Sequence, residues 1–173
     1  MEIHSFMNSV ITKTIFVRAA AFSATAILSV ALMNSLPRIR EQRQRSFTRA
    51  TMDGNLRRMR WLHFAGARVN ARTNLGNPLF LAASKGNLKA VRYLLDQGAD
   101  VNAREAGGST ALIEAAYNGH AEVIKELLLR GADINVISAQ GTALDIALNR
   151  KNTTADLLRH LGARTANDLR TGG

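Results

Sequence analysis

The apolar residues of this chain follow two different patterns. Residues 19–36 form one run of eighteen residues without a charge. Further along the chain, apolar residues come in short groups at helical spacing, such as Leu79, Ala82 and Ala83 at i, i+3 and i+4. The two patterns predict one long apolar helix followed by a series of short amphipathic helices.

The short helices are predicted to come in pairs. Gly86 and Asn87 separate the first apolar group from a second one, which lies at Val91, Leu94 and Leu95. A glycine then follows at position 98, where a helix commonly ends in a residue with left-handed backbone angles. Each unit is therefore predicted to be helix, turn, helix and loop.

A short block at the end of each unit recurs along the chain. GARVNAR at 66–72 returns as GADVNAR at 98–104 and as GADINVI at 131–137, at spacings of 32 and 33 residues. A weaker copy begins at Gly162, 31 residues after the previous one. Such a unit is too small to bury its own apolar face and gains stability only by stacking. We predict four stacked units within 47–164, at about 47–72, 73–104, 105–137 and 138–164.

Three elements of the third unit occur in an order that resembles the ankyrin-repeat signature. They are GSTAL at 108–112, AAYNGH at 115–120 and GADIN at 131–135. The resemblance covers roughly two thirds of the chain. It implies an all-α solenoid with antiparallel helices, projecting loop tips and a concave face that binds other macromolecules, as a rule without catalysis.

The chain departs from the family pattern at the start of the first helices. The histidine of the usual Thr-Pro-Leu-His motif is missing from every unit. Thr110 and Thr142 stand just before apolar helical patterns and are predicted to be N-caps, and Asp145 is placed to complete a capping box with Thr142. We expect only a modest loss of stability from the missing histidine.

Alignment on the repeat glycine predicts which side chains of the second helices are buried. One position is leucine in all four units, at Leu62, Leu94, Leu127 and Leu158. The next position is apolar in the inner units and polar in the outer two, at His63 and Arg159, as expected where a stack meets water. Trp61 and Tyr93 share the preceding position, where we expect packing on the outer helical layer.

The apolar run at 19–36 has the length of a membrane span. As a helix it would extend about 27 Å, just enough to cross a bilayer core. Five arginines between positions 38 and 49 follow it, whereas only Lys13 and Arg18 lie close before it. Dense positive charge tends to stay in the cytoplasm, so the run is predicted to be a single-pass transmembrane helix with the repeats on the cytoplasmic side. Residues 1–18 are then an N-terminal flank, 37–46 a basic linker and 165–173 a C-terminal tail.

Two other interpretations of the apolar run stay open. Ser29-Val30-Ala31 has the small-x-small form of a signal-peptidase site, which would make the repeats a periplasmic or secreted soluble protein. Glu2 is the only acid among the first forty residues, a bias also found in organelle presequences.

The positive charge is concentrated near the apolar run. The chain has a formal net charge of +10, and residues 38–72 hold ten arginines against Glu41 and Asp53. Residues 73–137 hold six basic and seven acidic side chains. Beside an apolar helix, arginines favour contact with anionic lipids, and we assign that contact to Arg38, Arg40, Arg43 and Arg45. Nucleic-acid binding ranks third among the functions considered, because no aromatic interleaving or groove-reading helix accompanies the charge.

The composition argues against catalysis. The chain has no cysteine, so it has neither a thiolate zinc site nor a cysteine nucleophile. Its four histidines have no recurring metal-ligand or triad spacing, and Gly107-Gly108 follows no predicted strand as a phosphate loop would. We expect no enzyme activity, no cofactor, no metal and no small-molecule substrate.

The expected function is binding of another protein by a scaffold tethered to a membrane. The alternative is an exported soluble protein that protects or inhibits its partner. The resemblance directs attention to loop tips and exposed ends of first helices, which here are Arg72, Asn74, Lys85, Arg104, Glu105, Tyr117, Asn118, Ile137, Asn149 and Arg150. Tyr117 is the leading candidate, because an exposed tyrosine offers a large apolar face and a hydroxyl at little entropic cost.

Overall fold

The computed structural model describes residues 36–171, and all regular elements among them are helices apart from two isolated β-bridges. The helices are α2 (Pro37–Met52), α3 (Leu56–Phe64), α4 (Pro78–Ser84), α5 (Leu88–Asp96), α6 (Ala111–Asn118), α7 (Ala121–Leu129), α8 (Ala143–Asn149), α9 (Thr154–His160) and α10 (Ala166–Arg170), with a short 3-10 helix η1 (Ala106–Gly108). The all-α prediction is confirmed for this part of the chain. The predicted flank 1–18 and the apolar run 19–36, except Leu36, lie outside the described residues.

The chain divides into two compact units, residues 1–42 and residues 43–173. Helices α3 to α10 belong to the second unit. No helix within residues 36–171 is long and apolar enough to cross a membrane.

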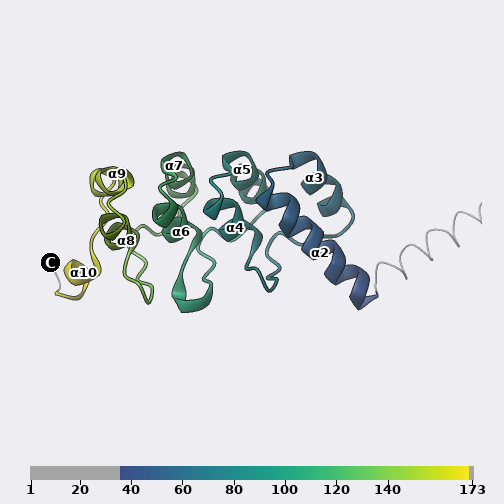
Figure 1. Ribbon diagram of the computed structural model, residues 1–173, viewed down its shortest axis with the longest axis horizontal. Coiled ribbons are helices and arrows are strands. Elements are labelled where there is room, and N and C mark those ends of the chain that lie inside the picture. Colours follow the sequence, from purple (N-terminus) through teal and green to yellow (C-terminus); the bar gives the residue numbers. More distant parts are fainter. Residues whose placement is uncertain (1–35, 172–173) are drawn as a thin grey trace, which may run out of the picture. The chain divides into compact units, whose positions relative to one another are not determined.

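Within the compact unit formed by residues 43–173, helix pairs follow one another in a row (Figure 1). The second helices α3, α5, α7 and α9 form one layer, and the first helices α4, α6 and α8 form the other. Each first helix packs on the next one, α4 on α6 and α6 on α8, and α5 packs on α7 in the same way. The loops between units project away from the second-helix layer (Figure 1). Stacking in series is the arrangement that the repeat spacing predicted.

The predicted caps start the first helices. Thr110 accepts a hydrogen bond from the Ile113 amide, and Thr142 forms a complete capping box with Asp145. Asn77 caps α4 in the same way, with Pro78 at the first helical position. Each cap satisfies amides that a helix start leaves without a partner. The caps predicted at Thr110 and Thr142 are confirmed, whereas the cap at Asn77 was not predicted.

The core of the stack contains the leucines that the repeat alignment selected. Leu94, Leu127 and Leu158 are fully buried and Leu62 is 6% exposed. Gly98 has a φ of 80°, as predicted for the residue that ends a helix in a left-handed conformation. The predicted register of the second helices is confirmed.

The asparagine of each repeated block holds the next block in place. The Asn70 side-chain carbonyl accepts the Asp100 amide at 2.9 Å, and its amide donates to the Gly98 carbonyl at 3.0 Å. Asn102 makes the equivalent pair of bonds to Asp133 and Gly131. Since these loops have no strand partners of their own, the asparagine side chains satisfy their backbone groups and fix the spacing between units.

A second set of side chains links the turns between paired helices to the preceding unit. Asn87 donates to the Met52 carbonyl at 2.6 Å, and Asn152 donates to the Ala116 carbonyl at 2.6 Å. His120 fills the same position in the third unit, with its Nε2 3.1 Å from the Ser84 carbonyl oxygen. His120 therefore has a structural role.

The N-terminal end of the stack differs from the sequence expectation. Residues 37–46, expected to be a basic linker, are part of α2. Arginine, glutamine and glutamate are good helix formers, and no glycine or proline interrupts the stretch after Pro37. Further along α2, Phe47 and Ala50 are fully buried. The sequence interpretation relied on charge density and gave too little weight to helix propensity.

His63 was expected to face water at the end of the stack, and the structure corrects this. Its ring lies 6.3 Å from the ring of Phe47 in α2 and 6.1 Å from the ring of Tyr93 in α5. Its Nδ1 is 2.9 Å from the Tyr93 hydroxyl. His63 is therefore half-buried, because α2 covers it from one side.

Candidate functional site

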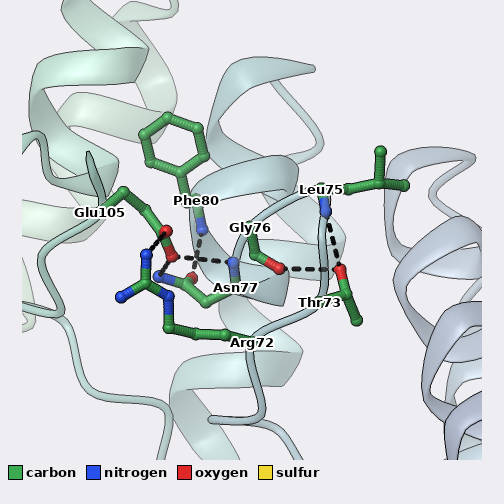
Figure 2. Close-up of polar contacts among 7 residues, drawn as sticks. All are labelled: Arg72, Thr73, Leu75, Gly76, Asn77, Phe80 and Glu105. Carbon is green, nitrogen blue, oxygen red and sulfur yellow. Dashed lines mark hydrogen bonds and ion pairs between the residues drawn. The ribbon is translucent and has the colours of Figure 1, made fainter.

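The loop that enters α4 carries a small hairpin with an exposed apolar tip. Thr73 and Gly76 exchange two backbone hydrogen bonds of 3.1 Å, and the Thr73 hydroxyl accepts the Leu75 amide at 3.2 Å. Leu75 is 55% exposed and points away from the neighbouring loop (Figure 2). The same hairpin recurs between Ser138 and Gly141. Leu75 was not among the predicted contact residues, although its place between Asn74 and Gly76 in a turn sequence could have identified it.

Glu105 joins this hairpin to the following loop. Its carboxylate accepts the Arg72 guanidinium at 2.6 Å, the Asn77 backbone amide at 2.9 Å and the Asn77 side-chain amide at 2.7 Å (Figure 2). The Glu105 side chain is only 9% exposed, whereas that of Arg72 is 60% exposed. A carboxylate with three donors has little capacity left for a partner, so Glu105 orders the loops while Arg72 presents a charge at their surface.

The loop before α6, which contains Gly107 and Gly108, is tied to the loop before α8 by a backbone hydrogen bond. Gly107 and Gly108 both have positive φ, 70° and 76°, which lets the chain turn tightly between Glu105 and Ser109. The Ala139 amide donates to the Gly107 carbonyl at 2.8 Å. Consecutive loop tips therefore support one another. The side chain of Asn74, in the loop before α4, and that of Arg104, in the loop before α6, are exposed.

A second group of predicted contact residues lies at the other end of the first helices. The Arg150 guanidinium lies over the Tyr117 ring, 4.1 Å from its centroid, and donates to the Tyr117 hydroxyl at 3.3 Å. Tyr117 is still 38% exposed. The stacking joins the end of α6 to the residue that caps α8, so two successive units share one aromatic and cationic surface.

The other members of this group lie close by in the chain. Asn118 follows Tyr117, and its side-chain amide donates to the Glu114 carbonyl and carboxylate, both at 3.0 Å. Asn149 precedes Arg150 and is exposed, and Lys85 is the exposed C-cap of α4. Ile137, the last predicted contact residue, is half-buried in the loop before α8.

The predicted contact residues therefore form two groups. Arg72, Asn74, Arg104, Glu105 and Ile137 lie in the loops that precede first helices, and Lys85, Tyr117, Asn118, Asn149 and Arg150 lie where first helices end. Helices of seven or eight residues separate the two groups, a length of about 10 to 12 Å. A partner that covers both groups would span the first-helix layer.

The predicted lipid-contact residues lie on α2. Arg38, Arg40 and Arg45 are exposed, and Arg43 is half-buried. All four precede the buried stripe of this helix, which begins at Phe47.

Trp61 corrects another sequence expectation. Tyr93 is half-buried as predicted, but Trp61, at the equivalent position of α3, is 66% exposed. Tyr93 packs against His63 of the preceding second helix, and within residues 36–171 no second helix precedes α3. Burial also raises the pKa of the Tyr93 hydroxyl above its ordinary value, with nearby Arg60 opposing that effect.

Comparison with known families matches residues 47–138 to ankyrin repeats, in three copies. That match covers more than half of the 173 residues. The chain belongs to the ankyrin-repeat family. No curated protein matches its sequence.

An ankyrin-repeat protein is an interaction module, so this chain is built to bind another protein. Ankyrin repeats are typically not enzymes. Within residues 36–171 the structure has no cluster of three or more histidine, aspartate or glutamate side chains that could hold a metal ion. The helix pair α8 and α9 lies beyond the three matched copies and extends the stack by one more unit.

Proposed function

We propose that this ankyrin-repeat protein is a membrane-tethered scaffold that binds another protein through its loop tips and the ends of its first helices. The observation that carries the proposal is the exposed Tyr117–Arg150 pair. A tyrosine ring already held by a guanidinium loses little side-chain freedom when a partner covers it, and Tyr and Arg are the residue types that most often anchor interfaces.

The charges on this surface indicate what the partner carries. Arg72, Lys85, Arg104 and Arg150 are exposed, whereas the carboxylate of Glu105 is taken up by its internal donors. Complementary charge mainly raises the association rate and excludes wrong partners. The partner is therefore a protein with an acidic patch beside an apolar contact for Tyr117 or Leu75.

The loop network supports the same function by limiting the cost of binding. Glu105, Asn70 and Asn102 hold successive loops before any partner arrives. Loops that are already ordered lose less conformational entropy on association.

The membrane part of the proposal rests on sequence. Residues 19–36 have the length and composition of a transmembrane helix, and the arginines at 38, 40, 43 and 45 follow directly. We place the repeats on the cytoplasmic side, with these arginines near anionic headgroups.

The test of the binding surface is affinity capture from detergent-solubilised membranes with the full-length chain. The double variant Tyr117→Ala/Arg104→Ala removes one anchor from each group, and we expect it to lose proteins that the wild type retains. The matched control is Leu129→Ala/Lys125→Ala, which removes an exposed apolar and an exposed basic side chain from α7 in the opposite layer. Equal capture by the wild type and the first variant would show that this surface is not the binding site.

The test of the tether is fractionation combined with protease protection. A cytoplasmic scaffold pellets with membranes, resists carbonate extraction and is shielded from external protease. Recovery of a shortened chain in a soluble exported fraction would instead support the alternative, a signal sequence cleaved after Ala31 and an exported ankyrin protein that protects or inhibits its partner. Nucleic-acid binding, the third candidate, predicts retention on RNA or DNA with a steep dependence on salt.

A further inference from the structure

Helix α3 carries an exposed face of aromatic and basic side chains. Arg57, Arg60, Trp61 and Phe64 lie at i, i+3, i+4 and i+7, within an arc of about 100° on the helix. Met59 and Leu62 are buried on the opposite side. Trp61 is 66% and Phe64 94% exposed, so two large apolar side chains of one short helix are in contact with water. We call these four residues together with Arg58 the α3 face.

The arginines of the α3 face differ from those of the other second helices. Arg57, Arg58 and Arg60 form no ion pair within residues 36–171, and α3 contains no acidic residue. The other arginines of this layer are paired with carboxylates: Arg92 with Glu126 at 2.8 Å, Arg130 with Asp96 at 2.7 Å and Arg159 with Asp156 at 3.2 Å. The unpaired arginines of the second-helix layer, Arg57, Arg58 and Arg60, therefore lie on the same helix as the exposed rings of Trp61 and Phe64.

From this arrangement we infer that the α3 face docks on an anionic lipid surface. Trp favours the headgroup region, where its ring leaves water and its indole N–H keeps a polar partner, and Phe is common on the apolar face of helices that lie in this region. Arginines beside them attract acidic headgroups. An acidic protein would satisfy the arginines but would not by itself require the exposed Phe64 ring. A nucleic acid would find no aromatic row or groove-reading element on one nine-residue helix.

The position of α3 is compatible with simultaneous partner binding. It belongs to the second-helix layer, and the loops project from the other side of the stack (Figure 1). The lipid contact therefore leaves the loop tips open, and it does not involve α6 or α8, which carry Tyr117 and end at Arg150. It goes beyond the proposed tether and does not depend on it, because every residue of the α3 face belongs to the second compact unit, residues 43–173.

Trp61 provides a local readout, because it is the only tryptophan in the chain. The full-length protein is reconstituted into vesicles of phosphatidylcholine alone and of phosphatidylcholine with phosphatidylserine. With phosphatidylserine we expect the Trp61 emission to shift to the blue and to be quenched by lipids brominated on their acyl chains. In phosphatidylcholine alone, Trp61 should stay accessible to an aqueous quencher, and added salt should reverse the shift.

Charge variants test the arginines. Arg57→Gln/Arg60→Gln should lower the ratio of docked to undocked protein about 30-fold, since each arginine near an anionic leaflet contributes about five-fold. Lys89→Gln/Arg170→Gln removes the same charge from exposed positions on α5 and α10 and should leave the emission shift nearly unchanged. Circular dichroism verifies that both variants keep their helices.

Three outcomes would overturn the inference. One is a Trp61 that stays in water on phosphatidylserine vesicles. Another is a Trp61 already shielded in phosphatidylcholine, which would mean that a second copy or another segment of this chain covers the α3 face. The last is a blue shift produced by RNA or an acidic protein without lipid. Carbonate extraction from the phosphatidylcholine vesicles reports on the tether separately, so failure of the tether and failure of the α3 contact give different results.

Discussion

Arg150 lies over the ring of Tyr117, with 4.1 Å between the guanidinium carbon and the ring centroid. The two residues come from successive units, so the contact forms only when α6 and α8 are stacked in register. It is a product of the stack, and it is the contact on which the proposed binding surface rests.

The Tyr117–Arg150 contact predicts a measurable coupling. In a double-mutant cycle with Tyr117→Ala and Arg150→Ala, the coupling in the free energy of unfolding should be about 0.5 to 1 kcal/mol, the range for exposed cation–π pairs. Tyr117→Phe keeps the ring and loses the hydroxyl, so it should retain most of the coupling. Urea denaturation measures the energies, and strictly additive single variants would show that the pair does not interact in solution.

Two leucines of α7 offer a matched comparison of burial. Leu127 is fully buried and Leu129 is 79% exposed, although they stand two residues apart on one helix. Leu127→Ala should cost about 2 to 5 kcal/mol in the free energy of unfolding, because it removes buried methyl groups and leaves a cavity. Leu129→Ala should change it by less than about 0.5 kcal/mol. Similar losses for the two variants would contradict the register of the stack.

Glu105 should stabilise the fold more by accepting hydrogen bonds from the Asn77 amides than by its ion pair with Arg72. Glu105→Ala leaves the backbone and side-chain amides of Asn77 without an acceptor in a buried position, and we expect a loss of about 1 to 3 kcal/mol. Arg72→Ala removes a largely exposed partner and should cost under about 1 kcal/mol. Thermal unfolding measures both, with Glu122→Ala, an exposed ion pair on α7, as the control. A larger loss for Arg72→Ala than for Glu105→Ala would refute this order.

Tyr93 should make the protein less stable at high pH. Burial raises the pKa of its hydroxyl in the folded state, so the folded state holds the proton more tightly than the unfolded chain. The resulting stabilisation is complete below the ordinary tyrosine pKa of about 10 and is lost as pH rises through the folded-state value.

The chain has two tyrosines, so Tyr117→Phe leaves Tyr93 as the only one. A phenolate absorbance titration of this variant should have its midpoint above the ordinary value, and the midpoint should return to that value in denaturant. A midpoint at or below the ordinary value in the folded protein would rule out the effect of burial.

The sequence was sufficient for the repeat, its caps and its buried positions because these features depend on local chemistry and period. Thr142 and Asp145 form their capping box within one helical turn, and Leu94 and Leu127 recur at the spacing of the repeat. It was insufficient for α2, where a dense run of arginines was interpreted as a linker although those residues favour a helix.

The candidate site was predicted by residue but not by arrangement. Sequence reasoning selected Arg72 and Glu105 as two equivalent surface residues, whereas the structure uses the Glu105 carboxylate internally. It selected Tyr117 and Arg150 from separate units without indicating that they stack. Contacts between residues more than thirty positions apart depend on how successive units are spaced and rotated, and a single repeat pattern does not specify this.

What the sequence by itself determined is a set of helix pairs that must stack, since each pair exposes apolar residues that only a neighbour can cover. What only the tertiary structure decided is which repeat-equivalent side chains stay in water. Trp61 and Tyr93 occupy the same position of the repeat, yet within residues 36–171 only Tyr93 has a preceding second helix to pack against. Burial depends on whether a neighbour is present, and a residue at the end of a stack has the same local sequence signals as one inside it.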